Sequence, residues 1–312
     1  MDKNKLKQII LKSFDIDSDV ATFVELKGGA ENKNYLFKSF DTTFVARLYG
    51  KTHSAKGIRD ASSIKNELKF MTEMQKGIYV PDVVKNRLGQ YYVALQEDNF
   101  SFLVIMRFIS GANPTTFDDN LIAKLADVLG KIFTMSSYFK VESMTEGLDI
   151  VSRAEERYQR YLLSTNHQDD QIASVIHKLY QEVKISSHAI PKLTKGYIHG
   201  DIKLQNMIVS DSGQLYLLDF DDYRYSYLLE DMVMTVMLNI DTKGLNLVRS
   251  GYLKKLIIEI NQPKLIAEVE SSLLMLLKAR LIYSLIGLID TNHSEKVLEI
   301  ISDIYIKDQI IK

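Results

Sequence analysis

The first hundred residues alternate between short apolar runs and turn residues. Five runs rich in β-branched and aromatic residues are separated by Gly, Asp and Asn, a pattern that is typical of strands. They read TFVEL, NYLF, TFVARLY, YYVAL and FLVIM. Segment 61–75 instead places Ile64, Leu68 and Met71 on one face of a helix. The pattern predicts a small antiparallel sheet with one helix packed on it.

After the turn-rich segment 110–114 the spacing of apolar residues becomes helical. The amphipathic segments are 118–140, 150–164, 170–186, 227–240, 246–259 and 264–290. Segment 197–222 is an exception, because YIHGD, NMIV and QLYLLDF are strand-like pieces joined by tight turns. We therefore predict an α+β chain with a sheet lobe at 1–108, a mainly helical lobe at 109–312 and a hinge at about 106–112.

The composition limits the classes of protein that fit. At 312 residues and 46% hydrophobic content, the chain can build the cores of two lobes. The absence of cysteine excludes a disulfide framework, thiolate zinc sites and a cysteine nucleophile. With 39 Lys plus Arg against 40 Asp plus Glu, the chain has no overall basic field for nucleic acid. Any phosphate site must be local.

Neither end of the chain predicts a membrane protein. The N-terminal MDKNKLKQIILKSF interrupts its apolar residues with lysines, unlike a signal peptide. The apolar stretch 271–289 is broken by Lys278 and Arg280, so it falls short of the roughly 18 uncharged residues of a membrane span. We expect a cytoplasmic protein without a membrane partner. The sequence leaves the oligomeric state open.

The chemistry of the chain is concentrated in 197–222. Phosphoryl transfer from a nucleotide requires a carboxylate beside the acceptor hydroxyl and ligands that hold Mg²⁺ against the phosphates. In YIHGDIKLQNMIV, Asp201 follows a short strand and Asn206 comes five residues later. Asp219 ends the strand QLYLLDF, 18 residues beyond Asp201. Carboxylate and amide oxygens suit Mg²⁺, so this ordered set predicts a phosphotransferase site.

HGDIKLQN and DFDD resemble the catalytic and metal-binding motifs of the aminoglycoside phosphotransferase and choline kinase group, which are relatives of protein kinases. The group also includes homoserine kinase and bacterial stress-response kinases. The resemblance implies a bilobal protein-kinase-like fold. It further implies that Asp201 is the catalytic base, that Asn206 and Asp219 are magnesium ligands, and that His199 supports the loop.

Two departures from protein kinases favour the small-molecule branch of this group. The chain has His-Gly-Asp where protein kinases have His-Arg-Asp, and Asp221 stands in place of the glycine of Asp-Phe-Gly. Lys203, however, matches a position where many protein kinases carry a catalytic lysine near the transferred phosphate.

The first lobe resembles a nucleotide site. Gly28 and Gly29, followed by Asn32, resemble the degenerate glycine loop of the family, although Gly-Gly between strands is also a common hairpin turn. In FVARLY, Arg47 stands where the family carries the lysine that grips the phosphates. Glu67, in the predicted helix, is its expected ion-pair partner.

FLVIMRFISG resembles the strand and hinge that join the lobes. The resemblance implies that Met106 closes the back of an adenine pocket. It also implies that the backbone of Arg107, Phe108 and Ile109 meets the adenine edge. The run fits a core strand equally well.

The leading hypothesis is an ATP- or GTP-dependent, Mg²⁺-dependent phosphotransferase. It would act on a hydroxyl of a small molecule, either an aminoglycoside-like antibiotic or a metabolite such as homoserine or choline. Residues 113–170 contain 10 acidic and 6 basic residues, which mildly favours a cationic acceptor.

Two alternatives remain open. One is a protein serine/threonine kinase of the bacterial stress-response type, although no Ala-Pro-Glu anchor follows Asp219. The other is an inactive nucleotide-binding scaffold, which would have no need to retain Asp201, Asn206 and Asp219 together.

Overall fold

The computed structural model describes residues 1–17, 23–26, 31–53, 57–136, 138–139, 148–164, 170–189, 193–237 and 263–290. Gly28, Gly29 and the helix expected at 246–259 lie outside the described residues. The chain divides into two compact units. The first comprises Met1–Asn113 and Met207–Asp222, and the second comprises Pro114–Asn206 and the described residues from Tyr223 onward.

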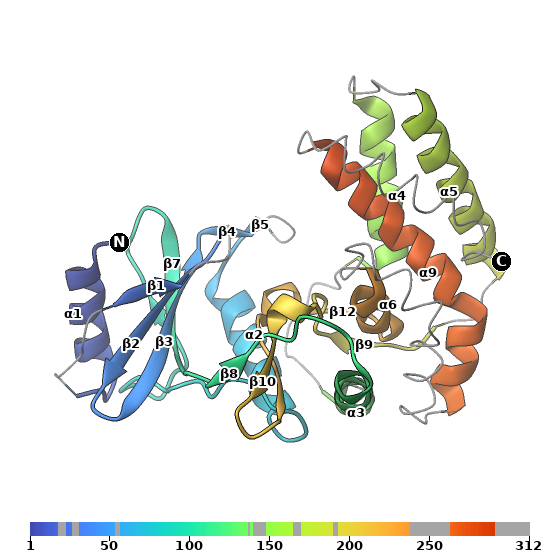
Figure 1. Ribbon diagram of the computed structural model, residues 1–312. Helices are drawn as coiled ribbons and strands as arrows, with labels where there is room; N and C mark the ends of the chain where they lie inside the picture. Colours follow the sequence, from blue (N-terminus) through green and yellow to red (C-terminus); the bar gives the residue numbers. More distant parts are fainter. Residues whose placement is uncertain are drawn as a thin grey trace. The chain divides into compact units, whose positions relative to one another are not determined.

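The first unit is built on a five-stranded sheet in which every neighbouring pair is antiparallel (Figure 1). Its strand order is β1-β2-β3-β7-β6. The five strands coincide with the five apolar runs of the sequence, so the predicted sheet is confirmed. Their bounds are β1 Val24–Leu26, β2 Lys33–Ser39, β3 Thr42–Gly50, β6 Val93–Ala94 and β7 Phe100–Arg107. Two short strands, β4 Thr52–His53 and β5 Gly57–Ile58, pair separately.

Side chains of β3 alternate between the two faces of the sheet, as the period of a strand requires. Phe44, Ala46 and Leu48 point into a buried apolar cluster that includes Leu6 and Ile10 of helix α1 (Lys3–Ser13). The N-terminal helix therefore forms part of the core of the first unit. The intervening residues of β3, Arg47 among them, belong to the opposite face.

Helix α2 (Ala61–Met74) carries the apolar stripe predicted at 61–75. Asp60 caps its N-terminus by accepting a hydrogen bond from the Ser63 N–H at 2.7 Å. Ile64 and Leu68 are each 1% exposed, so the stripe is core.

The first unit is completed by a hairpin that comes from much later in the chain. Strands β10 (Met207–Ser210) and β11 (Leu215–Leu217) pair with each other, and β10 also pairs with β8 (Gly111–Ala112). The short helix η2 (Phe220–Asp222) follows this hairpin and brings Asp219 and Asp221 into the first unit.

The second unit is mainly helical, as predicted. Helix α9 packs against α4, α5 and α6. Its helices are α3 Asp119–Ser136, α4 Ile150–Leu163, α5 Asp170–Ala189, α6 Leu229–Met237 and α9 Pro263–Asp290. Strands β9 (Lys195–Ile198) and β12 (Arg224–Tyr227) form an antiparallel pair next to η1 (Leu204–Asn206).

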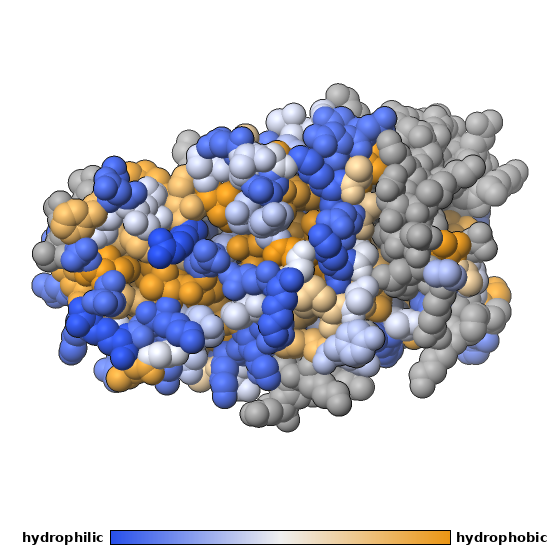
Figure 2. All heavy atoms as spheres, turned by 90° about the horizontal axis from the view of Figure 1, so that it is seen from below, coloured by the Kyte–Doolittle hydropathy of each residue, from blue (hydrophilic) through white to orange (hydrophobic). Residues whose placement is uncertain are grey.

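Part of α9, Ser271–Asp290, is long and apolar enough to cross a membrane by length and composition. Half of that stretch is buried inside the structure, and core helices of soluble proteins meet the same criterion. On the face seen in Figure 2, hydrophilic side chains are interspersed with apolar patches.

A matched pair of phenylalanine substitutions tests the sheet core. Phe37 is 1% exposed in the apolar cluster, whereas Phe40, in the β2–β3 turn, is 63% exposed. We expect Phe37→Ala to cost about 3–5 kcal/mol through lost burial and a residual cavity. Phe40→Ala should stay within about 0.5 kcal/mol of the wild type. Urea denaturation followed by circular dichroism measures both, and equal midpoints would contradict the assignment of this core.

Candidate active site

The predicted catalytic loop lies in the second unit and begins with a backbone turn that requires glycine. Gly200 has φ +83°, in the left-handed region that residues with a Cβ rarely adopt. This conformation explains why a glycine separates His199 from Asp201. The loop follows β9 directly and ends in η1.

Asp231, in the first turn of α6, holds this loop through its backbone. Its carboxylate accepts hydrogen bonds from the N–H groups of His199 at 2.8 Å and Gly200 at 2.7 Å. Burial raises the pKa of Asp231, although the neighbouring His199 and both N–H donors oppose that shift. His199 is fully buried, and its Nδ1 accepts from the Asp201 N–H at 3.2 Å. Both residues therefore fix the shape of the loop.

The carboxylate of Asp201 is held by the two other predicted residues of the loop. Its Oδ2 accepts from Lys203 Nζ at 2.6 Å and from Asn206 Nδ2 at 2.8 Å. The nitrogen of the Asn206 amide is thus turned toward Asp201, which leaves the amide oxygen as the atom that can bind a hard cation. The structure brings Asp201, Lys203 and Asn206 together as a compact group.

The predicted phosphate residues lie in the first unit. Arg47 Nη2 pairs with Asp219 Oδ1 at 2.5 Å and lies 3.4 Å from Asp221 Oδ2. Asp219 has φ +63°, a left-handed conformation that Asp tolerates better than most residues. The Arg47 guanidinium and the Asp219 carboxylate are therefore in direct contact.

Asp221 forms the centre of a buried ion-pair network. Arg59 donates to both of its carboxylate oxygens, with Nη2 at 2.6 Å from Oδ2, and Asn32 Nδ2 donates at 2.6 Å. Burial alone would raise the pKa of Asp221, but the hydrogen bonds from Arg59 and the charges of Arg47 and Arg59 hold it well below its usual range. Asn32 also accepts from the Gly50 N–H at 3.2 Å, which links the network to the end of β3.

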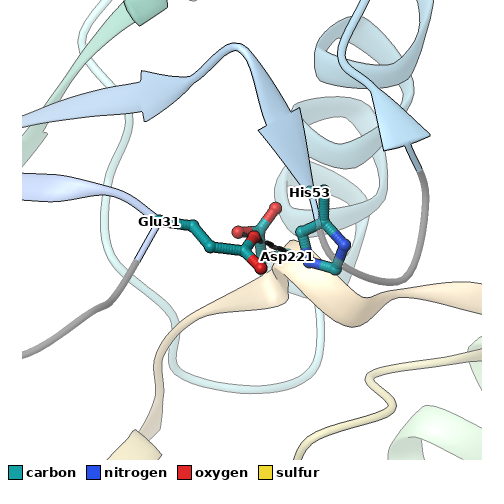
Figure 3. A group of neighbouring side chains, drawn as sticks. All are labelled: Glu31, His53 and Asp221. Carbon is teal, nitrogen blue, oxygen red and sulfur yellow. Dashed lines mark ion pairs between the residues drawn. The ribbon is translucent and has the colours of Figure 1, made fainter. Parts of the chain in front are cut away.

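Glu31, His53 and Asp221 turn their polar atoms toward one another (Figure 3). One ligand atom from each lies within 4.8 Å of the others, a spacing that could suit a metal ion. His53 Nε2 is 3.8 Å from both carboxylates, and Arg59 Nη2 is 3.6 Å from Glu31. Because Arg59 already supplies a positive charge to both carboxylates, we assign this group to the Asp221 network.

Glu67 accepts a hydrogen bond from the Tyr49 hydroxyl at 2.7 Å. The Tyr49 ring has the guanidinium groups of Arg47 at 4.9 Å and Arg59 at 5.1 Å from its centroid. The negative charge of Glu67 is one of several that raise the pKa of Arg47 against the effect of burial. Among the described residues, Arg47 pairs with Asp219 and Asp221, and Glu67 instead accepts from Tyr49, so the expected Arg47–Glu67 ion pair is wrong.

The predicted hinge residues end β7. The N–H of Arg107 donates to the Asp82 carbonyl at 2.9 Å, and that of Phe108 donates to the Thr43 carbonyl at 3.0 Å. Any adenine contact by this segment would therefore use carbonyl groups or the Ile109 N–H. Met106, one residue earlier, is partly buried in β7.

Four residues of this side of the first unit were not predicted from the sequence: Arg59, His53, Glu31 and Tyr49. Arg59 precedes the Asp60 helix cap, where a charged residue attracts no attention, and its partner Asp221 is 162 residues away. The one available signal was Asp221 itself, an acidic residue where the motif has glycine. A buried carboxylate requires a compensating positive charge, which predicts a basic partner elsewhere in the chain.

Comparison with known proteins gives the family. The family model described as the phosphotransferase enzyme family matches residues 22–263. No curated protein matches the chain significantly.

Solved structures of similar fold are more numerous. Amicoumacin kinase in complex with AMP-PNP and Ca²⁺ has a TM-score of 0.70 and 14% identity, over 96% of this chain and 92% of its own. Spectinomycin phosphotransferase in complex with ADP and spectinomycin has a TM-score of 0.63 and 15% identity, and the match covers 92% of this chain and 87% of that one. A microcompartment-associated aminopropanol kinase has a TM-score of 0.63 and 14% identity, and the match covers 94% of this chain and 98% of that one.

At these identities the structural likeness establishes the fold, and the family match covers most of the chain. The expected kinase-like fold is thereby confirmed. The chain belongs to the phosphotransferase enzyme family.

Proposed function

We propose that this phosphotransferase moves the γ-phosphoryl group of ATP or GTP to a hydroxyl of a small molecule. The observation that carries the proposal is the Asp201 carboxylate held by Lys203 and Asn206 on a loop whose backbone is fixed by Asp231. A carboxylate held in this way can take a proton from an acceptor without rearranging. A nucleotide donor is supported by similar structures that contain AMP-PNP, ADP or GDP.

In the proposed reaction, Asp201 accepts the proton of the acceptor hydroxyl. The acceptor oxygen forms a bond to the γ-phosphorus while the bond from that phosphorus to the β–γ bridging oxygen breaks. The nucleoside diphosphate leaves with the electron pair of that bond. Lys203 and Asn206 keep Asp201 oriented, and Lys203 adds positive charge near the transferred group.

The donor phosphates are assigned to Arg47, whose planar guanidinium can contact two oxygens at once. Asn206 and Asp219 would hold Mg²⁺, since they offer an amide and a carboxylate oxygen, the kind of ligand that this ion prefers. Bound Mg²⁺ neutralises phosphate charge. Gly28, Gly29 and the 106–109 segment remain proposed nucleotide contacts from family resemblance.

A small molecule fits better than a protein as the acceptor. From Asp219 the chain passes through η2 and β12 directly into α6 at Leu229, so little chain is left there for a peptide-binding activation segment. The proteins of similar solved structure are also named as kinases or phosphotransferases of small molecules. We further propose a cytoplasmic enzyme without a nucleic-acid or membrane partner.

The base is tested by Asp201→Asn, which keeps the shape of the side chain and removes its basicity. We expect kcat to fall by about 10²–10⁴-fold while Mg–nucleotide affinity changes little. The acceptor for this kcat assay would first be identified by an ATP-consumption screen of aminoglycosides, macrolides, choline, homoserine, sugars and a generic protein. Asp211→Asn, in the exposed β10–β11 turn, is the matched control. Unchanged kcat in Asp201→Asn would remove it as the base, and a screen with neither turnover nor Mg²⁺-dependent nucleotide binding would remove the kinase function.

The Asp221 network is tested by Asp221→Asn. We expect a loss of about 3–5 kcal/mol of stability at pH 7, because Arg59 stays buried without its anion, and a raised KM for nucleotide through Arg47. Since the folded-state pKa of Asp221 is lowered, its stabilisation is complete above the unfolded pKa of about 3.9 and is lost as the pH falls toward the folded value.

Urea midpoints measured from pH 3 to pH 8 follow this dependence. The gap between the wild type and Asp221→Asn should be constant above about pH 5 and should narrow below about pH 4. Asp222→Asn, whose side chain is 34% exposed, serves as the control. Equal midpoints at pH 7 would contradict the role of Asp221.

A further inference from the structure

Three arginines surround one tyrosine in the second unit. Their guanidinium carbons lie 4.6 Å (Arg153), 4.0 Å (Arg157) and 5.3 Å (Arg280) from the ring centroid of Tyr283. Arg153 also donates to the Tyr283 hydroxyl, and Arg157 to the Tyr283 carbonyl, both at 2.9 Å. All four residues, which we call the arginine cluster, are partly buried and so remain reachable by a solute.

Negative charge in this cluster falls short of the positive charge. Arg157 has Asp290 at 3.8 Å, and Asp290 is 54% exposed. Within the described ranges, neither Arg153 nor Arg280 has an ion pair with a carboxylate. The Nε of Arg280 is buried and has no hydrogen-bond partner. A buried donor without a partner is unusual in a native protein and calls for an explanation.

Local electrostatics agree with this excess of positive charge. Burial, together with the charges of Arg224 and Arg153, lowers the pKa of Arg280 to about 10, so the guanidinium stays charged at neutral pH. Burial would raise the pKa of Tyr283, but the charges of Arg153 and Arg157 lower it. Like charges held together without an anion are costly, and a bound anion would relieve that cost.

The cluster is connected to the proposed catalytic loop within the same unit. Ile150, the first residue of α4, donates its N–H to Glu230 at 2.9 Å, and the next residue, Asp231, holds the loop. Arg153 follows one turn later on α4. The Asp201 charge is also among those that act on the pKa of Arg280, which places that guanidinium within electrostatic reach of the proposed base.

We propose that the arginine cluster binds an anionic group of the acceptor, so that the acceptor carries a carboxylate or a phosphate in addition to its hydroxyl. This inference rests on the proposed function for the hydroxyl chemistry and adds the class of acceptor. Guanidinium groups suit both anions because their planar donors match the spacing of the oxygens. Asp201 would face the hydroxyl of the acceptor, and the arginine cluster of the same unit would bind its anionic group at a second point.

This inference differs from the mildly cationic acceptor expected from the charge count of residues 113–170. On α4, Glu155 and Glu156 are exposed, and Glu155 accepts from the Tyr180 hydroxyl of α5 at 2.7 Å. Arg153 and Arg157 lie on the face of α4 that meets α9. A count along the sequence mixes these two faces, whereas an acceptor meets only one of them.

The test is a binding titration of the full chain with pairs of compounds that differ only in the anion. Hydroxy acids are compared with their amides, and phosphorylated polyols with the free polyols. Kanamycin serves as the polycationic control. We expect at least one acid or phosphate to bind at least about tenfold more tightly than its neutral partner, and Arg280→Met to abolish that difference. Arg160→Met, at an exposed position of α4, the helix that carries Arg153 and Arg157, should retain it. The two sets of pairs distinguish a carboxylate from a phosphate.

The thermal midpoint of Arg280→Met distinguishes an arginine that binds a ligand from one that only stabilises the fold. Because Arg280 has a buried, unpartnered Nε, Arg280→Met should keep or raise the thermal midpoint while it removes anion binding. Arg280→Lys, which retains the charge, should keep part of the discrimination. Equal binding of charged and neutral partners by the wild type, or unchanged discrimination in Arg280→Met, would overturn the inference.

The same experiments distinguish this inference from the kinase function. Phosphorylation of aminoglycosides or neutral sugars alone, abolished by Asp201→Asn, would keep the kinase function and overturn the anionic acceptor. Anion binding that depends on Arg280, without transfer to any acceptor, would overturn the kinase function and support the anion site.

Discussion

The buried carboxylate of Asp221 determines how the polar side of the first unit is arranged. Its partners Arg59, Asn32 and Arg47 come from segments 162 to 189 residues distant in the chain. No local propensity brings these segments together, and the attraction between buried opposite charges is strong enough to fix their register. Arg47 lies between this anion and Asp219, at 3.4 Å from the first and 2.5 Å from the second, so the network extends to both carboxylates.

Asp231 supports the catalytic loop by a different physical means. It accepts backbone N–H groups rather than cationic side chains, and burial shifts its pKa upward where that of Asp221 is shifted downward. Backbone donors fix the path of the chain itself, whereas arginines fix the positions of side chains. The catalytic loop thus has a rigid path, and the phosphate side has a rigid set of charges.

The local pattern of apolar residues was sufficient to predict the positions of helices and strands. The stripe of Ile64 and Leu68 predicted a helix at 61–75, and α2 is Ala61–Met74; the five strand runs were equally clear. Motif spacing also grouped Asp201, Lys203 and Asn206, because loop residues so close in sequence are close in space. Arg59 could not be found in this way, since its importance depends on a partner far along the chain.

The same limit applies to the arginine cluster. Arg153 and Arg157 are four residues apart and so share a helix face, which the sequence can indicate. Which face of α9 they meet depends on the packing of two helices more than a hundred residues apart, and no periodicity encodes that choice.

The hairpin of β10 and β11 has a consequence for how this protein could be divided. Its strands complete the first unit by pairing with β8, yet they are encoded after about half of the helical unit. A fragment that ends at Asn113 would leave the edge of β8 open and would lack Asp221, the anion that pairs with Arg59. During synthesis, the first unit can therefore reach its final charge balance only after residue 222 has left the ribosome, by which time residues 114–206 of the second unit have already been made.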